Sequence, residues 1–318
     1  MPVFLFPGQG AQFSGMGMDM YDADTDGSMG IRNLFDSASS IYGKDIRTVL
    51  NSDAEVLKRT DVSQIAITVV SLAAVRFLSA RNIGVSACAG FSLGEYPALA
   101  VSGILSEEDT LKLVIERGRI MQKASDALAS SGDEPAGMSV VLGLSSGQID
   151  EIIASSGTGD LYAANYNSPL QTVVSGTAPA LEKAAEIFKE AGARRVLRLK
   201  VAGPFHSPLM NEAKEEFAAV LENFAFSDPS IPVFSNVTGK RITGGAEAKQ
   251  CAARHLVSPV RWTLEESEIA LLMQGLKNEI REDIPELIEA GPGKVLSGLW
   301  TDSGLPGVCK PYTEAGRE

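Results

Sequence analysis

Two short apolar segments in this chain each end at glycines and lead into helical patterns. Residues 3–6 (VFLF) run into PGQG at 7–10, and residues 85–89 (VSACA) run into GFSLG at 90–94. Apolar residues recur at helical spacing over 62–80, and a second helical pattern follows residue 94. Because strands and helices alternate in this order, the sequence predicts a parallel sheet of the α/β class.

The middle of the chain predicts a second, smaller unit. Its elements are a strand at 138–144, a helix at 146–154, strands at 161–165 and 172–175, a helix at 178–191 and a strand at 195–201. The order β-α-β-β-α-β is that of the split βαβ unit of ferredoxin-like folds. We expect residues 131–201 to form an inserted subdomain, with a linker at 130–134. Residues 1–130 and 202–318 then form one large subdomain, because 202–318 look too poor in strands for a sheet of their own.

Composition and charge exclude several classes of protein. A net charge of −12, from 40 acidic and 28 basic residues, disfavours nucleic-acid and anionic-membrane partners. The sequence has no run of about 18 apolar residues, so we expect no transmembrane helix, and the N-terminus lacks the pattern of a signal peptide. Three widely spaced cysteines and only two histidines argue against a disulfide framework and a metal site. We expect a cytoplasmic protein.

The segment GFSLG at 90–94 fits the G-x-S-x-G pattern of a nucleophile elbow. An apolar strand precedes it and a helical pattern follows it, so the glycines would permit a tight turn that exposes the Ser92 hydroxyl. The backbone N–H groups of the following helix would then face developing negative charge. The alternative is structural, because Ser92 and Glu95 also have the spacing of a capping box.

A nucleophilic serine needs a base, and the chain offers two histidines. His206 lies between two prolines in a loop that follows an apolar strand, which suits a positioned side chain. His255 ends a predicted helix, where we expect its side chain to interact favourably with the helix C-terminus. No Asp or Glu stands out as a third member of a triad.

Two further positions carry open alternatives. The PGQG turn departs from the dinucleotide and P-loop patterns, so it is either a plain turn or a second source of oxyanion-binding N–H at Gln9. Arg117 lies on a predicted helix beside Glu116. Spacing alone favours a solvated Arg117 paired with a nearby Glu, and the sharper hypothesis is a buried receptor for a carboxylate.

Seven ordered segments resemble one family, the malonyl-CoA:acyl-carrier-protein transacylases and the related acyltransferase domains of polyketide synthases. The matches are FPGQGAQ at 6–12, FSLGEY at 91–96, RGRIMQ at 117–122, NYNSP at 165–169, GPFHS at 203–207, SPVRW at 258–262 and GPGKVL at 291–296. The resemblance spans Phe4 to about Leu299. It implies a hydrolase-like large subdomain and a ferredoxin-like small one.

The resemblance also implies roles for individual residues. Ser92 would be the nucleophile and His206 its base, the Gln9 and Leu93 backbone N–H groups would form the oxyanion hole, and Arg117 would bind the malonyl carboxylate. In this family a backbone carbonyl usually orients the catalytic histidine. The residue that supplies it is usually Gln, and here it is His255, of which only the main chain is needed.

Three more positions concern the substrate pocket. Asn165, in the matching NYNSP segment, is expected to contact substrate. Phe205 precedes the catalytic histidine, where a bulky aromatic residue in related acyltransferases accompanies the use of malonyl rather than methylmalonyl groups. Phe91 stands where the family commonly has His, which affects the pocket wall.

The resemblance therefore implies ping-pong transfer of malonyl from malonyl-CoA to the phosphopantetheine thiol of acyl carrier protein, in fatty acid biosynthesis. The resemblance implies no metal or redox cofactor. A polyketide-pathway acyltransferase, and a serine thioesterase or hydrolase on the same elbow, remain alternatives. A further one is a non-catalytic phosphate-binding or scaffold protein in which Ser92 only caps a helix.

Overall fold

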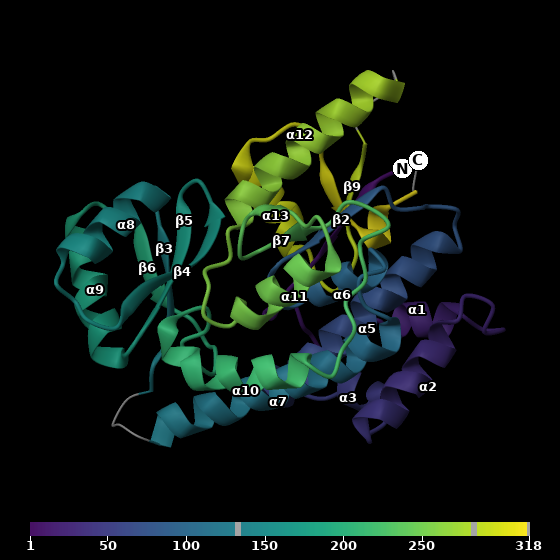
Figure 1. The fold of residues 1–318 in the computed structure, drawn as a ribbon, viewed down its shortest axis with the longest axis horizontal. Coiled ribbons are helices and arrows are strands. Elements are labelled where there is room, and N and C mark those ends of the chain that lie inside the picture. The colour runs from purple at the N-terminus through teal and green to yellow at the C-terminus, as the bar shows by residue number, and fades with distance from the viewer. Residues whose placement is uncertain (131–134, 281–284, 317–318) are drawn as a thin grey trace.

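A computed structural model describes residues 1–130, 135–280 and 285–316. It contains a four-stranded parallel sheet, a separate four-stranded antiparallel sheet and a two-stranded ribbon. Figure 1 shows the antiparallel sheet and its helices α8 and α9 on the left, beside the larger helical body that surrounds the parallel sheet. The predicted α/β class, with a large and a small subdomain, is confirmed.

The parallel sheet runs in the order β10 (Cys309–Pro311), β9 (Leu287–Glu289), β1 (Val3–Phe6) and β2 (Ala87–Gly90). β1 and β2 are buried along their whole length, so their continuous apolar pattern reflects a sheet covered on both faces. The register pairs Phe6 with Gly90, which brings the ends of both strands to the same edge.

Helices of the large subdomain surround this sheet. They are α1 (Met18–Ala23), α2 (Ile31–Tyr42), α3 (Ile46–Leu50), α4 (Ala54–Lys58), α5 (Thr60–Ser79), α6 (Glu95–Val101), α7 (Glu107–Ser130), α10 (Asn211–Leu221), α11 (Gly245–Arg254), α12 (Trp262–Ile280) and α13 (Val295–Ser303). The sequence predicts no transmembrane helix, yet by length and composition α5 could cross a membrane. Its most apolar stretch is 78% buried inside the protein, so it is a core helix.

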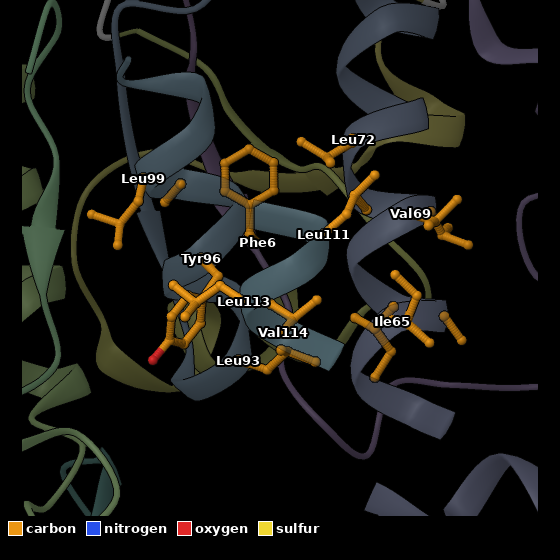
Figure 2. Close-up of a cluster of buried hydrophobic side chains, with 14 of the residues drawn as sticks. Phe6, Ile65, Val69, Leu72, Leu93, Tyr96, Leu99, Leu111, Leu113 and Val114 are labelled. Atoms are coloured by element: carbon orange, nitrogen blue, oxygen red, sulfur yellow. The ribbon is translucent and has the colours of Figure 1, made fainter. Parts of the chain in front are cut away.

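The main core lies between α5, α7 and the elbow region. Figure 2 shows α5 and α7 facing each other through aliphatic side chains, with Phe6 of β1 beside them. All of the side chains labelled there are at most 4% exposed. They are Phe6, Ile65, Val69, Leu72, Leu93, Tyr96, Leu99, Leu111, Leu113 and Val114.

The small sheet has the order β4 (Leu161–Ser168), β5 (Gln171–Gly176), β3 (Gly137–Leu142), β6 (Arg195–Arg198). With α8 (Ser146–Ser155) and α9 (Ala178–Glu190) as crossovers, this is the ferredoxin-like arrangement. β4 continues three residues beyond its predicted end, and β6 stops three residues short of its own. Residues 131–134 of the predicted linker lie outside the described residues, so the subdomain limits stay a prediction.

Residues beyond 202 complete the large subdomain. β9 and β10 join β1 in the parallel sheet. β7 (Phe234–Ser235) and β8 (Lys240–Arg241) form the two-stranded ribbon, and a bridge between Cys88 and Val233 places the start of this ribbon against β2. Two distant stretches of chain therefore build one sheet and surround one edge of it.

The turn after β2 packs against β1 so closely that its glycines have no room for a side chain. A Cβ at Gly94 would lie 2.0 Å from the Phe6 carbonyl oxygen, and one at Gly90 would lie 1.9 Å from the Gly94 oxygen. A Cβ at Gly8, in the turn after β1, would lie 2.3 Å from the Phe91 oxygen. The two turns are therefore in backbone contact.

We predict that Gly94→Ala destabilises the protein, because backbone rather than a flexible side chain must move. The expected loss is about 1–3 kcal/mol or more, as for other overpacked sites. Gly298→Ala is the matched control: this helical glycine has nothing within 4 Å of its Cβ position, and alanine there should stabilise α13 by about 0.5–1 kcal/mol. Urea unfolding measures both. Equal stabilities for the two variants would contradict the close approach.

Candidate active site

Ser92 lies at the carboxyl edge of the parallel sheet, two residues beyond β2. It begins a 3-10 turn (Ser92–Gly94) that leads into α6. Its φ of 51° is in the left-handed region, which a residue other than glycine rarely adopts. Strain of this kind persists where the surroundings enforce it, and it often marks a functional site. The predicted nucleophile elbow is thus present in geometry.

His206 meets Ser92 from a distant part of the chain. Ser92 Oγ and His206 Nε2 are 2.8 Å apart, and His206 is 4% exposed. On the other side of the ring, Nδ1 lies 3.0 Å from the His255 carbonyl oxygen and 3.1 Å from that of Ser258. Two backbone carbonyls therefore face Nδ1 and orient the imidazole, in the place where a triad would have a carboxylate.

The surroundings favour a neutral His206. Burial, together with the positive charge of Arg117, lowers its pKa to about 4, against the opposing effect of the two carbonyl contacts. A neutral imidazole with its proton on Nδ1 presents a free lone pair at Nε2. This is the protonation state that can accept the Ser92 hydroxyl proton.

The capping-box alternative for Ser92 is wrong. The N-cap of α6 is Gly94, without a side-chain cap, and the Ser92 hydroxyl contacts His206 instead. Glu95 turns inward, where its Oε2 accepts from the Asn236 backbone N–H at 2.7 Å. Burial raises the pKa of Glu95 to about 7.

Arg117 is buried, so the expectation of a solvated side chain paired with a nearby Glu is wrong. The side chain is 1% exposed, and none of the ion pairs among the described residues involves it. Nη1 donates to Gln64 Oε1 at 2.8 Å, and Nη2 lies 3.2 Å from His255 Nδ1. Within the described residues its buried Nε has no hydrogen-bond partner. Burial lowers the pKa of Arg117, so this is a desolvated cation with a donor to spare.

The expectation for the His255 side chain is also wrong. His255 does follow α11 directly, but its ring is 1% exposed and lies among polar side chains of the site. Burial and the Arg117 charge hold the pKa of His255 well below its usual range. A neutral ring offers no charge to the helix C-terminus, so the helix-dipole argument does not apply.

Sequence reasoning missed Asn236 and Gln64. The Asn236 Oδ1 accepts from the Ser92 backbone N–H at 2.6 Å, and its Nδ2 donates to the Gly90 carbonyl at 2.7 Å. Asn236 thus supports the elbow from the ribbon. The sequence signal for Gln64 is a large polar residue within the apolar pattern of α5, where the structure buries it fully. The sequence signal for Asn236 is weaker, because it is only the first residue of the turn segment NVTG at 236–239.

The remaining predicted residues lie around this centre. Gln9 is three residues beyond β1, and Leu93 follows Ser92 in the 3-10 turn, so both come from the carboxyl ends of neighbouring strands. Phe205 is 5% exposed and packs in the main core. Asn165 is buried on β4, where a parallel bridge joins it to Val260, two residues after the Ser258 carbonyl that contacts His206.

An open groove of about 390 Å³ reaches His206 between the small subdomain and the loop after Val257. Its lining is mostly apolar and includes side chains from α8 and β4. Two of the lining residues are hydrogen-bonded to each other, since the Tyr166 hydroxyl donates to Asp150 Oδ1 at 2.8 Å. A long, largely uncharged ligand arm can approach the dyad along this groove. Among residues 1–130, 135–280 and 285–316, no cluster of three or more His, Cys, Asp or Glu could hold a metal.

A serine on a strained strand-to-helix turn, paired with a histidine, defines the class of enzymes that work through an acyl-serine intermediate. The chain belongs to the acyl transferase domain family, whose model matches residues 3–274.

Individual relatives cover nearly the whole chain. The malonyl CoA-acyl carrier protein transacylase of Bacillus subtilis (strain 168) is 38% identical over 299 residues, which is 93% of this chain and 88% of the relative. An acyl carrier protein S-malonyltransferase from Vibrio cholerae superimposes with a TM-score of 0.85 at 34% identity, covering 97% of this chain and 95% of the other. A malonyl-transacylase in complex with a type II PKS acyl-carrier protein gives 0.82 at 32% identity, covering 97% and 94%.

We predict that Ser92 reactivity stays level with falling pH until His206 becomes protonated near pH 4. A neutral fluorophosphonate reports this reactivity without using Arg117, and the labelling rate can be followed by intact mass. An exposed histidine would instead halve the rate near pH 6.5. Ser92→Ala is the blank, and far-UV circular dichroism shows that the protein is folded at each pH. A midpoint near 6.5 would contradict the burial argument.

Proposed function

We propose that this protein transfers a malonyl group from malonyl-CoA to the phosphopantetheine thiol of acyl carrier protein through an acyl-serine, in fatty acid biosynthesis. The observation that carries this proposal is a Ser92–His206 pair beside a buried Arg117 with an unused donor. The pair supplies acyl transfer, and the arginine supplies the preference for an acyl group that ends in a carboxylate. The names of the relatives support the same activity.

In the first half-reaction, Ser92 Oγ attacks the thioester carbonyl while His206 Nε2 takes the hydroxyl proton. The backbone N–H groups of Gln9 and Leu93 stabilise the tetrahedral oxyanion, and coenzyme A leaves as the thiol after His206 returns the proton. In the second half-reaction, the carrier thiol attacks the acyl-serine by the reverse sequence. Each step exchanges one acyl bond and one proton, so we propose no metal or redox cofactor.

Arg117 is the proposed receptor for the malonyl carboxylate. Its guanidinium is desolvated, and a carboxylate can accept two of its N–H groups at once. Acetyl lacks that carboxylate and would leave the buried cation without its counter-charge. Asn165 and Phe205 complete the proposed substrate pocket, with Phe205 disfavouring a 2-methyl group.

Binding of the carboxylate also strengthens the base. The Arg117 charge is one cause of the low pKa of His206, second to burial. A malonyl carboxylate beside Arg117 offsets that charge, so the pKa of His206 rises when the correct substrate is bound. A base with a pKa nearer neutrality accepts the serine proton more readily.

The alternative functions differ from the proposed one in the molecule that accepts the acyl group. A thioesterase would release free malonate to water, whereas the transferase keeps the acyl-serine until a thiol arrives. The match to a malonyl-transacylase solved with a polyketide carrier favours the polyketide pathway as the second candidate. Kinetic comparison of fatty-acid and polyketide carriers distinguishes the two pathways.

We place the enzyme in the cytoplasm, in keeping with three buried free cysteines.

We predict a malonyl adduct on Ser92. Intact mass spectrometry after mixing with malonyl-CoA should show a stable adduct that disappears when holo carrier protein is added. Ser92→Ala should show none, and His206→Ala should form it about 10²–10⁴ times more slowly. Rapid appearance of free malonate would identify a hydrolase, and an adduct on Ser92→Ala would overturn the whole mechanism.

We predict that Arg117→Ala loses malonyl loading by a factor of several hundred or more, since breaking one side of a buried pair costs about 3–5 kcal/mol. Acetyl loading should fall less, so the malonyl/acetyl ratio of kcat/KM collapses. Arg117→Lys should recover little, because an ammonium lacks the planar fork. Arg119→Ala is the control on the same helix: Arg119 is half exposed and pairs with Glu116 and Glu216. If Arg117→Ala keeps the wild-type ratio, the carboxylate receptor lies elsewhere.

A further inference from the structure

The side chain of His255 connects the parts of the site that the mechanism treats separately. Its Nδ1 lies 3.2 Å from Arg117 Nη2, and its Nε2 lies 3.2 Å from Asn236 Oδ1. The same Asn236 oxygen accepts the backbone N–H of Ser92. The His255 backbone carbonyl contacts His206. One residue therefore touches the base, the carboxylate receptor and the support of the nucleophile.

The partners of His255 fix its tautomer. A guanidinium only donates hydrogen bonds, so His255 Nδ1 must accept and carries no proton. The ring proton then lies on Nε2, where it faces the Asn236 oxygen at 3.2 Å and Glu95 Oε2 at 3.5 Å, both acceptors. Asn236 Nδ2 is occupied by Gly90 and Glu265 oxygens, which fixes the orientation of that amide.

The partners of His206 fix the opposite tautomer. Its Nδ1 faces two carbonyl oxygens, which only accept, so Nδ1 carries the proton. Its Nε2 then accepts from the Ser92 hydroxyl. The two rings lie edge to face with centroids 5.4 Å apart. Adjacent buried imidazoles therefore carry their protons on different nitrogens.

We propose that the His255 side chain is a positioning residue for malonyl selectivity: as the neutral Nε2–H tautomer, it anchors the Arg117 guanidinium to the Asn236 support of the elbow. This role rests on the proposed function, in which Arg117 receives the malonyl carboxylate. Arg117 has five N–H groups, of which Gln64 and His255 occupy one each. With both terminal nitrogens held, the plane of the guanidinium is fixed, so its remaining N–H groups can meet a carboxylate in one orientation.

The proposal concerns the side chain alone. The resemblance assigned His255 only a backbone carbonyl, which any residue supplies. A side-chain role predicts that substitutions with the same backbone differ according to the acceptor that they offer to Arg117.

The first test is the tautomeric state, measured by ¹⁵N NMR on protein labelled at histidine. The chain has only two histidines, so two imidazoles are observed. We expect one ring protonated at Nδ1 and the other at Nε2, and His255→Asn should remove the second signal set. Proton on Nδ1 of His255, or a charged His255 ring at neutral pH, would overturn the proposal without any measurement of activity.

The second test compares His255→Asn with His255→Leu. Asn places its amide oxygen near the position of Nδ1 and does not reach that of Nε2, so both variants lose the Asn236 contact and only Leu loses the Arg117 contact. We expect Leu to lower malonyl loading about 10–100-fold relative to Asn, as for a hydrogen bond to a charged group. Between these two variants, acetyl loading and fluorophosphonate labelling should differ by no more than about threefold, because both keep the backbone carbonyl that faces His206 and both lose the Asn236 contact.

The outcomes separate this proposal from the function on which it rests. If Arg117→Ala collapses the malonyl/acetyl ratio but His255→Leu and His255→Asn share one ratio, the positioning role is wrong and the receptor assignment stands. If Arg117→Ala keeps the ratio, the receptor assignment is wrong. A parallel loss of labelling and of both acyl loadings in His255→Leu would show a merely structural role. Should His255→Leu fail to fold, His255→Ala makes the same comparison, because alanine also offers no acceptor to Arg117 and needs no additional space.

Discussion

The candidate site is organised around a positive charge that the protein has buried among neutral partners. Arg117 is desolvated, and its direct hydrogen-bond partners are the amide of Gln64 and the ring of His255 rather than a carboxylate. Such a charge is costly to bury unless it has a counter-charge. Its field reaches both imidazoles and lowers their pKa values, and it opposes the upward shift in the pKa of Glu95. The protonation states of the site thus follow largely from burial and from one guanidinium.

The turn after β2 is the second constraint, and it acts through sterics. Because Gly90 and Gly94 carry no Cβ, the backbone can approach itself and β1 closely enough to reverse within a few residues, with Ser92 in a left-handed conformation. The backbone N–H of Ser92 is then turned toward Asn236, on a ribbon more than 140 residues away in sequence. The geometry of the elbow therefore depends on more than its own residues, because it needs a segment that follows the small subdomain in the sequence.

Much of this was accessible from sequence, and the reasons are physical. The Gly-x-Ser-x-Gly segment and the alternation of strand and helix carry their own local signal, as does the β-α-β-β-α-β order of the insert. Element ends were less accessible: β6 stops at Arg198 although apolar residues continue to Val201. The burial of Arg117 was inaccessible from spacing alone, because Glu116 beside it offered an equally good surface partner. Long-range contacts such as that of Asn236 with Ser92 leave no periodic trace.

The His255 position shows how a backbone role and a side-chain role can occupy one residue. Any residue there could supply the carbonyl that faces His206, so the main chain alone places no demand on the side chain. The side chain is nevertheless completely enclosed, and it meets a donor on one nitrogen and acceptors on the other. A neutral imidazole meets both demands at once, since it always has one N–H and one lone pair. Carboxylate recognition and general-base strength are consequently coupled through the charge of Arg117, which is one cause of the low pKa of His206 and which a bound carboxylate offsets.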